Sequence, residues 1–409
     1  MDVIRQQVPM TFRYAVYFTT GLFGPGNEVL REILTSADDP APADVLVVLD
    51  AGVAEAHPSL EADILLSLEA QADLVHLAGP ILTVPGGEQS KNDPRHLEAI
   101  QNAIHAAALC RHSYVIAVGG GAVLDVVGYA AATTHRGIRL IRVPTTVLAQ
   151  DDSAVGVKNG VNAFGTKNYF GTFAPPYAVI NDFAFLQTLE DRDWLGGVSE
   201  AVKVALIRDA GFFAELEHQA PALVARDANT MEQVVRRSAA LHLTHIASAG
   251  DPFELGTSRP LDFGHWAAHR LEHLSSHRLR HGEAVAIGMA LDSTYSWLTG
   301  SLAEADWHRI IDLLLALRLP VFTEELGAHL DAPNHEWSVM RGLEEFREHL
   351  GGRLTVMLLG GIGRAFDVHE IETAGMIRSI EVLKRVHEAG SSQAAAEMVA
   401  ASAPSRGAS

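Results

Sequence analysis

The chain contains 409 residues with a formal net charge of −19; 48% of its residues are hydrophobic and 20% are charged. These values are typical of a soluble globular protein with two domains. The acidic balance argues against nucleic acid or an anionic membrane as a partner, because phosphate backbones need a basic surface. It is compatible with a small phosphorylated substrate. The single cysteine, Cys110, excludes intrachain disulfides, and without a signal-peptide pattern or a long apolar run it predicts a cytoplasmic protein.

The first part of the chain alternates between strand-like and helical patterns. Alternating β and α segments predict a doubly wound parallel sheet, and from Arg192 onward helical periodicity dominates. We therefore expect a Rossmann-like α/β domain over residues 1–190, an all-α metal-binding domain over 191–390 and a disordered tail over 391–409. The strand-like runs cover residues 11–18, 44–50, 78–84, 114–118, 138–143 and 175–180, with one late pair of strands expected around 353–359.

Two features of the first domain suit a dinucleotide. Gly119, Gly120 and Gly121 directly follow an apolar strand and open a helix, so their backbone N–H groups could approach a pyrophosphate. This pattern is not the GxGxxG fingerprint and is weak alone. Asp50 ends another strand, where a carboxylate can bond a ribose hydroxyl or can simply cap the next turn.

The stretch from Val143 to Asn168 follows a strand and has no regular periodicity. A long polar loop after a strand is where open α/β sheets bind ligands, although it can also be a solvated connection. Four of the five lysines in the chain fall inside motifs, and lysine can donate or accept a proton whereas arginine cannot. The side chains of this loop that can bond oxygen are Thr145, Thr146, Asp152, Ser153, Lys158, Lys167 and Asn168.

The helical half carries a candidate metal site. His265 and His269 are four residues apart and therefore share one helix face, and His281 opens a later helix. Upstream, Glu200 and Lys203 are three residues apart. Imidazole with carboxylate suits zinc, cobalt or iron, although the 20 histidines of the chain make chance pairs common.

Seven short blocks follow one another along the chain: residues 85–91, 119–125, 136–137, 143–168, 200–203, 262–269 and 281–284. Together, in this order, they resemble the dehydroquinate synthase-like sugar phosphate cyclases. The resemblance covers roughly residues 80–300, and it implies the two-domain fold, NAD, a divalent metal (zinc or cobalt) and a homodimer.

The resemblance also implies roles for individual residues. Glu200, His265 and His281 correspond to metal ligands, and His269 to a polar active-site residue that is not a ligand. Arg136 corresponds to a residue that reaches the substrate phosphate of the neighbouring subunit. The positions that resemble NAD contacts are Asp50, Glu88, Lys91, Gly120, Gly121, Asp125, Thr145 and Thr146. The positions that resemble substrate and catalytic contacts are Asp152, Lys158, Lys167, Asn168 and Lys203.

The implied reaction converts a heptulose phosphate into a carbocycle. NAD transiently oxidises a ring hydroxyl, phosphate is eliminated, the ketone is reduced again, and an intramolecular aldol step closes the ring. The metal would lower the pKa of the hydroxyl that is oxidised. Lysines and Arg136 would hold the phosphate and hydroxyls by charge-assisted bonds.

The chain departs from the dehydroquinate synthase pattern where that family binds the substrate carboxylate. Ser258 and Asp262 stand at the positions of an arginine and an asparagine. A lysine expected upstream is replaced near Thr244, with His242 and His245 close by, and a late Asp-Lys-Lys reads Phe346-Arg347-Glu348. Lost cations and an added carboxylate disfavour a carboxylate-bearing substrate, because unpaired like charges in a closed site are costly.

We therefore hypothesise a neutral-ended ketose phosphate such as sedoheptulose 7-phosphate, as in the valiolone-type synthases, which also carry Asp at the position of Asp262. Those enzymes tend to lack the second histidine, whereas His269 is present here. One alternative is a genuine 3-dehydroquinate synthase acting on the heptulosonate phosphate. Another is an iron-type NAD-dependent alcohol or polyol dehydrogenase, which shares the two-domain plan but continues Pro-Thr-Thr with a different loop.

Overall fold

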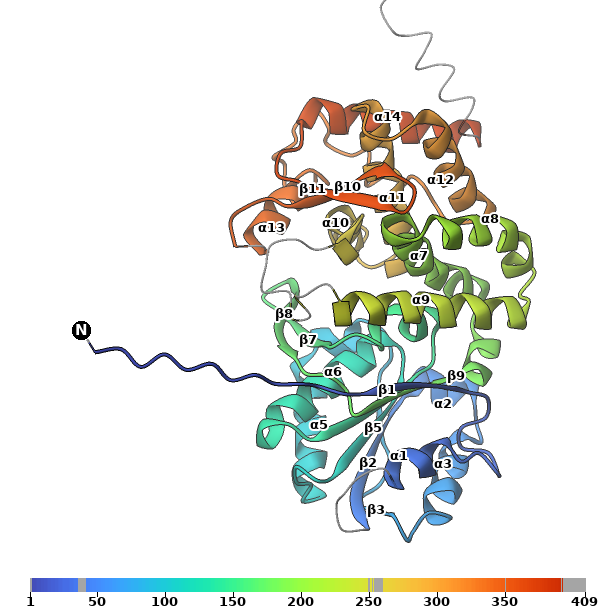
Figure 1. Ribbon diagram of the computed structural model, residues 1–409, viewed down its shortest axis with the longest axis vertical. Helices are drawn as coiled ribbons and strands as arrows, with labels where there is room; N and C mark the ends of the chain where they lie inside the picture. The colour runs from blue at the N-terminus through green and yellow to red at the C-terminus, as the bar shows by residue number, and fades with distance from the viewer. Residues whose placement is uncertain are drawn as a thin grey trace, which may run out of the picture. The chain divides into compact units, whose positions relative to one another are not determined.

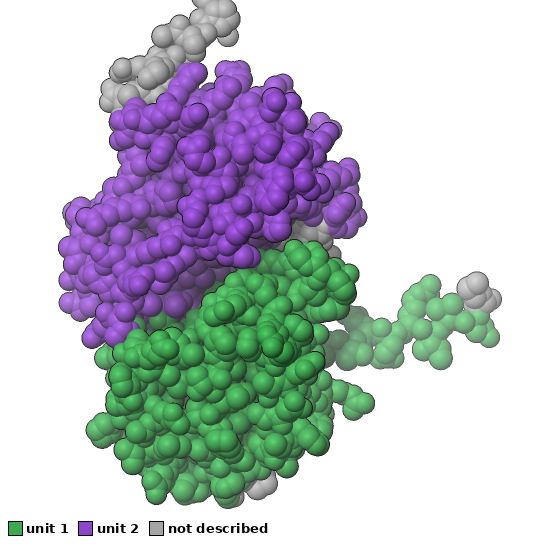
Figure 2. All heavy atoms as spheres, turned by 180° about the vertical axis from the view of Figure 1, so that it is seen from behind, with its two compact units in different colours: residues 1–145, 153–185 green, residues 146–152, 186–409 purple. Residues whose placement is uncertain are grey.

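The computed structural model describes residues 2–35, 42–248, 251, 253, 260–349, 351–390 and 392. The chain forms two compact units (Figure 2). Unit 1 contains residues 1–145 and 153–185, and unit 2 contains residues 146–152 and 186–409. Residues 146–152, which we expected in the α/β domain, therefore belong to the helical unit, because they pack with the helices that follow residue 186.

Unit 1 is built on a parallel sheet of seven strands with helices on both faces (Figure 1). Its strand order is β1-β9-β6-β5-β2-β3, and β4 also pairs with β2. All of these pairings are parallel, which confirms the expected fold class. The strands are β1 (Ala15–Thr19), β2 (Ala43–Asp50), β3 (Val75–Leu77), β4 (Leu82–Val84), β5 (Tyr114–Gly119), β6 (Arg139–Pro144) and β9 (Ala178–Asp182).

The central strands explain why the sheet forms. Residues 45–50 of β2 and all of β5 are buried, and both strands are almost continuously apolar, as strands covered on both faces must be. The chain places β3 and β4 on one side of β2 and β5 on the other, so the carboxyl ends of β2 and β5 flank a topological switch point, where ligands of such sheets bind. The helices of this unit are α1 (Val29–Thr35), α2 (Ala51–Ala56), α3 (Leu60–Glu69), α4 (Gln89–Asn92), α5 (Pro94–Ala106) and α6 (Gly121–Thr133).

The polar stretch after β6 is not an irregular loop throughout, and in this respect the expectation from the sequence is wrong. It begins with a π-helical turn, η2 (Ala149–Ser153), and continues as the antiparallel strands β7 (Lys158–Ala163) and β8 (Thr166–Phe173). Phe164 and Gly165 form the turn with positive φ angles of 54° and 74°. Lys158 therefore lies at the start of one strand, and Lys167 and Asn168 lie in the other.

Unit 2 is mainly helical, as expected, and contains one antiparallel pair of strands, β10 (Val356–Gly361) and β11 (Arg364–Val368). Helix α11 is its centre, because residues 284–296 are all buried. No helix in the described ranges is long and apolar enough to cross a membrane. The helices are α7 (Asp191–Arg208), α8 (Ala210–Val224), α9 (Ala228–Ser248), α10 (His265–Leu274), α11 (His281–Leu298), α12 (Glu304–Ala316), α13 (Arg341–His349) and α14 (Thr373–Ala389).

Glycines let three helices of unit 2 approach very closely. A Cβ atom at Gly282 of α11 would lie 2.0 Å from the carbonyl oxygen of Gly196 in α7, and one at Gly288 would lie 2.0 Å from that of Gly264. Gly264 also has a φ of +79° and directly precedes α10. Backbone contacts at this distance exclude any side chain. They join the start of α11 to the first third of α7, and the start of α10 to the middle of α11.

Candidate active site

Three potential metal ligands meet in unit 2. Glu200 lies in α7, while His265 and His281 are the first residues of α10 and α11. Oε1 of Glu200 lies 3.6 Å from Nε2 of His265 and 3.5 Å from Nε2 of His281. One ligand atom from each residue lies within 4.8 Å of the others. These are the three residues that the family resemblance implied as ligands.

The spacing of these atoms fits a divalent metal. Atoms about 2.1 Å from a tetrahedral ion are about 3.4 Å apart, close to the two measured distances, which are too long for hydrogen bonds. Burial, together with Lys203, lowers the pKa of His265, which keeps its imidazole neutral as a ligand must be. Burial opposes the charge of Glu200, but Lys203 and the histidines outweigh it and lower the pKa of Glu200 to about 2. The trio therefore offers two imidazole nitrogens and an ionised carboxylate.

The other nitrogen of each histidine is also bonded. Nδ1 of His265 lies 3.1 Å from the carbonyl oxygen of Phe263, and Nδ1 of His281 lies 3.2 Å from Oε2 of Glu272. Such partners fix the tautomer and ring orientation of metal-binding histidines. Glu272, one turn after His269 in α10, is a site residue that the sequence reading missed, although its spacing of seven from His265 places it on the same helix face.

His269 lies beside this trio. Its ring centroid is 5.5 Å from that of His265 and 6.1 Å from that of His281. Together with Glu272 and His281, it forms a second group of three potential ligand atoms within 4.8 Å. Because Glu272 already bonds Nδ1 of His281, we interpret His269 as a polar neighbour of the trio.

Lys203 and Asp152 extend the site. Nζ of Lys203 contacts Oε2 of Glu200 and lies 3.5 Å from Oδ1 of Asp152, and the Lys203 side chain is only 2% exposed. Burial opposes its charge, but Asp152 and Glu200 outweigh burial and raise the pKa of Lys203. Oδ1 of Asp152 also lies 2.8 Å from Nδ1 of His242 in α9. Lys203 is therefore a fixed cation between two carboxylates.

The positions that the sequence suggested for substrate specificity lie in different surroundings, and not all of them are near Lys203. Asp262 is half-buried in the short turn η4 (Pro260–Asp262); its charge adds to the raised pKa of Lys203 and opposes the lowering of the pKa of His265. Thr244 is exposed, and its hydroxyl donates to the carbonyl of Ala240 within α9. Arg347 is exposed and paired with Glu344, and Ser258 lies outside the described residues.

In unit 1, several expected cofactor contacts gather at the carboxyl ends of the strands. Asp50 ends β2, is 6% exposed and accepts a hydrogen bond of 2.9 Å from the N–H of Gly52. Burial raises the pKa of Asp50, and N–H groups including that of Gly120 counteract this effect. Gly119 accepts a bond from the N–H of Thr145, whose buried hydroxyl has no partner among the described residues. Gly121 begins α6.

A polar network joins α4, α6 and the β7–β8 hairpin. Nζ of Lys91 lies 2.6 Å from Oδ2 of Asp125 and also contacts Oδ1 of Asn168. Asn162 donates to Oε1 of Glu88 at 2.8 Å and accepts from the N–H of Asn168 at 2.8 Å. The structure thus brings together three expected NAD contacts and one expected substrate contact.

The remaining predicted residues are less clustered. Lys158 is exposed at the start of β7, and Lys167 is half-buried in β8. Thr146 begins the segment that belongs to unit 2. Arg136 is exposed in the turn before β6 and therefore lies at the amino ends of the strands, opposite the edge with Asp50 and Thr145. Within one chain it does not join that cluster.

Comparisons with known proteins agree with this architecture. Residues 81–196 match the family model of the 3-dehydroquinate synthase N-terminal domain, and residues 197–335 match that of the C-terminal domain. Together these matches cover more than half of the 409 residues. The chain belongs to the 3-dehydroquinate synthase family.

The relatives to which the chain is similar include enzymes named for two different reactions. The chain is 42% identical over 241 residues to the 3-dehydroquinate synthase of Geobacter sp. (strain M21), covering 59% of this chain and 66% of that enzyme. It is 38% identical over 296 residues to the 2-epi-5-epi-valiolone synthase of Streptomyces glaucescens, covering 71% and 72%. The first match thus spans just under two thirds of the relative's length.

A solved structure supports the assignment of the chain to this family. The 2-epi-5-epi-valiolone synthase ValA from Streptomyces hygroscopicus subsp. jinggangensis 5008, determined with NAD+ and Zn2+ bound, superposes with a TM-score of 0.81 and 29% sequence identity. The superposition covers 93% of this chain and 99% of that one. The fold of this family member is therefore shared over almost its whole length.

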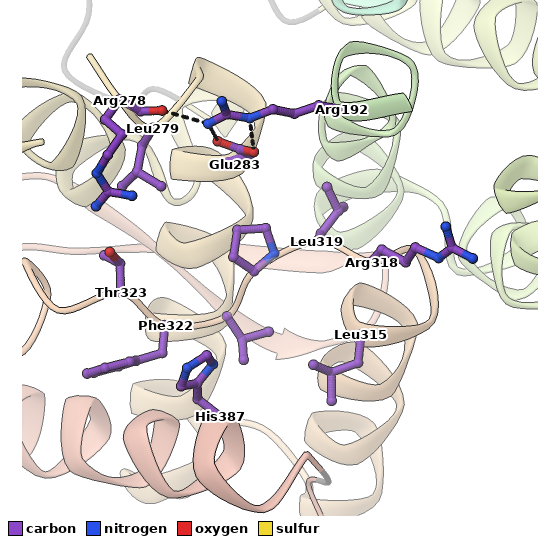
Figure 3. A pocket seen from close by; sticks show the side chains of 12 residues that line it. Arg192, Arg278, Leu279, Glu283, Leu315, Arg318, Leu319, Phe322, Thr323 and His387 are labelled. Atoms are coloured by element: carbon purple, nitrogen blue, oxygen red, sulfur yellow. Dashed lines mark hydrogen bonds and ion pairs between the residues drawn. The ribbon is translucent and has the colours of Figure 1, made fainter. Parts of the chain in front are cut away.

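A cavity of about 510 Å³ is lined by residues of α7, of the first turn of α11, of α12 and of α14 (Figure 3). Arg192 of α7 reaches Glu283 there with two charge-assisted bonds and also bonds the carbonyl oxygen of Arg278 at 2.6 Å. Arg278 is itself paired with Glu325. Two of the cavity's three arginines are therefore already engaged by carboxylates. The Arg192–Glu283 pair ties α7 to the first turn of α11, two residues after His281.

Asp151 is an unusual feature that the sequence reading missed, although it is visible as a second acid beside Asp152. It is 1% exposed, and neither carboxyl oxygen has a hydrogen-bond partner among the described residues. Burial, followed by Asp152 and Glu200, raises its pKa well above the ordinary value of 3.8. Its surroundings therefore favour the protonated form of Asp151.

We expect the Asp151→Val variant to be more stable than the natural chain at neutral pH by about 1–3 kcal/mol, because a buried polar group without partners is replaced by an apolar one. The folded-state pKa lies above the unfolded value of 3.8, so the stability from protonated Asp151 is complete below that value and is lost as pH rises through the folded pKa. In thermal unfolding at a series of pH values, the stability difference should thus grow as pH rises above 3.8 and level off once pH exceeds the folded-state pKa.

Asp292 provides the matched control. It is also fully buried, and burial raises its pKa to about 7, but it accepts bonds from the indole of Trp266 at 2.9 Å and from the N–H of Gly264 at 3.1 Å. Asp292→Val leaves two buried donors unpaired and should destabilise the fold by about 2 kcal/mol or more. Equal losses in both variants would contradict the account given for Asp151.

Proposed function

We propose that this chain is an NAD- and divalent-metal-dependent sugar phosphate cyclase, a phosphate-eliminating carbon–oxygen lyase that forms a carbocycle from a heptulose phosphate. The observation that carries the proposal is the trio of Glu200, His265 and His281 with the buried cation Lys203 against it. The trio supplies a metal site, and Lys203 supplies a fixed charge for oxygen atoms of a substrate.

The residues present suit both cofactors of the related ValA. Glu200, His265 and His281 would hold the metal, zinc or cobalt, and the strand-end cluster of unit 1 around Asp50, Gly120 and Thr145 would hold NAD. The other positions proposed for NAD are Glu88, Lys91, Gly121, Asp125 and Thr146. When bound, NAD supplies a reversible oxidation of one substrate hydroxyl, and the metal polarises the oxygen concerned.

The chain's own residues would position the substrate. Lys203, whose pKa is raised, stays protonated and would donate charge-assisted hydrogen bonds to substrate oxygens. Asp152 would accept from a hydroxyl, and His269 lies beside the metal trio where it would meet the same groups. Lys158, Lys167 and Asn168 are the further proposed substrate contacts. In a homodimer, Arg136 of one protomer would reach the phosphate held by its partner.

The substrate that we propose is a neutral-ended ketose phosphate resembling sedoheptulose 7-phosphate. Around Lys203 the described residues place Asp152, Glu200 and Asp262, with Asp151 and Asp152 adjacent in η2. One lysine therefore faces several acids. A substrate carboxylate would be desolvated against like charges, whereas hydroxyl groups would find acceptors.

The test is phosphate release from a panel of substrates. We expect the chain, supplied with NAD and Zn2+ or Co2+, to release inorganic phosphate from sedoheptulose 7-phosphate and to form a cyclic product detectable by NMR. NADH should not accumulate, because the oxidation is reversed within each turnover. The heptulosonate phosphate is measured in parallel, and a preparation stripped of metal is the control.

Other outcomes would support other functions. Turnover of the heptulosonate phosphate alone would identify a 3-dehydroquinate synthase, as the 42% identity to such an enzyme allows. Steady accumulation of NADH with an alcohol, and no release of phosphate, would identify a dehydrogenase. Either result would contradict the ketose proposal.

A further inference from the structure

His242 lies at the end of the buried face of α9, and the other residues of that face are apolar or small. The buried residues of this helix are Met231, Val234, Val235, Ser238, Ala239 and His242, spaced as one helix face. An apolar residue at position 242 would complete the stripe. The imidazole is instead 8% exposed, with Nδ1 2.8 Å from Oδ1 of Asp152.

The contacts among Asp152, Lys203 and His242 determine which of their polar atoms remain available to a ligand. Both contacts of Asp152, to Lys203 and to His242, fall on Oδ1, and the carboxylate side chain is 20% exposed. Oδ2 is therefore the oxygen that can accept from a ligand. With Nδ1 of His242 bonded to Asp152, Nε2 is the ring nitrogen that makes no hydrogen bond to the described residues. Asp152 therefore offers Oδ2 as an acceptor, held in place by the contacts of its Oδ1 with Lys203 and His242.

A carboxylate oxygen such as Oδ2 of Asp152 binds a hydroxyl well and another carboxylate poorly, because a hydroxyl can donate a hydrogen bond and an ionised carboxylate cannot. We infer that the His242–Asp152 pair determines substrate specificity by binding hydroxyl groups and rejecting a carboxylate. This inference rests on the proposed function and assigns its specificity to named atoms. It also moves the specificity position on α9 from Thr244, whose hydroxyl is bonded within its own helix, to His242.

The experiment compares the same new side chain at the two positions. His242→Lys places an ammonium group against Asp152, whereas Thr244→Lys places it on the exposed face of α9. The ratio of kcat/KM for sedoheptulose 7-phosphate to that for the heptulosonate phosphate is measured with NAD and metal bound. We expect His242→Lys to shift this ratio towards the heptulosonate by about 30-fold or more, and Thr244→Lys to change it by less than about threefold.

A second variant separates substrate binding from a structural role. His242→Asn keeps a donor near the position of Nδ1 but has no atom at the position of Nε2. We expect KM for the ketose phosphate to rise about tenfold while kcat changes by less than about threefold, and thermal unfolding and metal content to match those of the natural chain. This variant also provides the answer if His242→Lys does not fold.

The outcomes are distinct. If the natural chain converts the ketose phosphate but His242→Lys keeps its substrate ratio, or His242→Asn keeps its KM, then His242 is a structural partner of Asp152 and the inference is wrong. An equal shift in His242→Lys and Thr244→Lys also overturns it. If the natural chain releases phosphate from neither sugar, the proposed function itself fails.

Discussion

The Glu200→Gln variant should lose its metal and nearly all of its activity. Glu200 is the carboxylate of the trio, 1% exposed, with Oε1 3.6 Å and 3.5 Å from the ligand nitrogens of His265 and His281. A neutral amide in its place removes the anionic ligand and turns a donor towards Lys203. We expect less than about 0.1 metal ion per chain after dialysis, and a fall in kcat/KM of about 10³-fold, since metal polarisation is worth several kcal/mol.

Two further glutamate-to-glutamine substitutions are expected to reduce metal binding less, or not at all. Glu272→Gln alters the partner of Nδ1 of His281, so metal affinity should fall by about 10–100-fold. Glu344→Gln changes an exposed glutamate of α13 and should leave metal content unchanged. Metal is measured by mass spectrometry, and Co2+ absorption spectra give the geometry of the loaded site. Tight, stoichiometric metal in Glu200→Gln would show that the trio is not the metal site.

Helical spacing identified candidate residues for a metal site but not the trio itself. Residues four apart share a helix face, so His265 and His269 had to point to one side, and Glu200 and Lys203 are related in the same way in α7. Sequence spacing alone did not decide which histidines are ligands. The resemblance to a family supplied that distinction, and the measured distances group His265 and His281 with Glu200.

The parallel sheet was also predictable, but the β7–β8 hairpin was not. Buried strands of a parallel sheet are continuously apolar and are recognised from composition, as in β2 and β5. Strand β8 is exposed along most of its length and contains Lys167, Asn168 and Gly171, so neither hydrophobic alternation nor composition marks it. Its pairing with β7 is a tertiary choice that propensity does not reveal.

The positions that we propose for substrate specificity were only partly predictable, for a related reason. A one-dimensional comparison places a missing lysine near Thr244, but the face of α9 that packs inward contains His242, two residues earlier. Two residues correspond to about 200° of rotation on a helix, so such a shift moves a side chain from the buried face to the exposed one. Asp151 was missed similarly, because no pattern in the sequence distinguishes an orphaned acid from a solvated one.

The largest effect on folding should come from Gly282→Ala. Gly282 follows His281 in α11, and an added Cβ would lie 2.0 Å from the carbonyl oxygen of Gly196 and 2.6 Å from its carbonyl carbon, both backbone atoms of α7. Neither atom can move without shifting a helix. We expect a loss of about 3 kcal/mol or more in unfolding free energy, together with weakened metal binding, because α11 carries His281 away from Glu200.

Gly196→Ala tests the same contact from the opposite side. A Cβ at Gly196 would meet nothing within 4 Å, so the substitution adds no clash. Alanine is the better helix former, so the variant should be as stable as the natural chain or more stable by up to about 1 kcal/mol. Urea unfolding and metal titration of the two variants compare one methyl group on either side of one contact. If Gly282→Ala folded as stably as Gly196→Ala and bound metal equally well, the close approach of α7 and α11 would not be what holds His281 against Glu200.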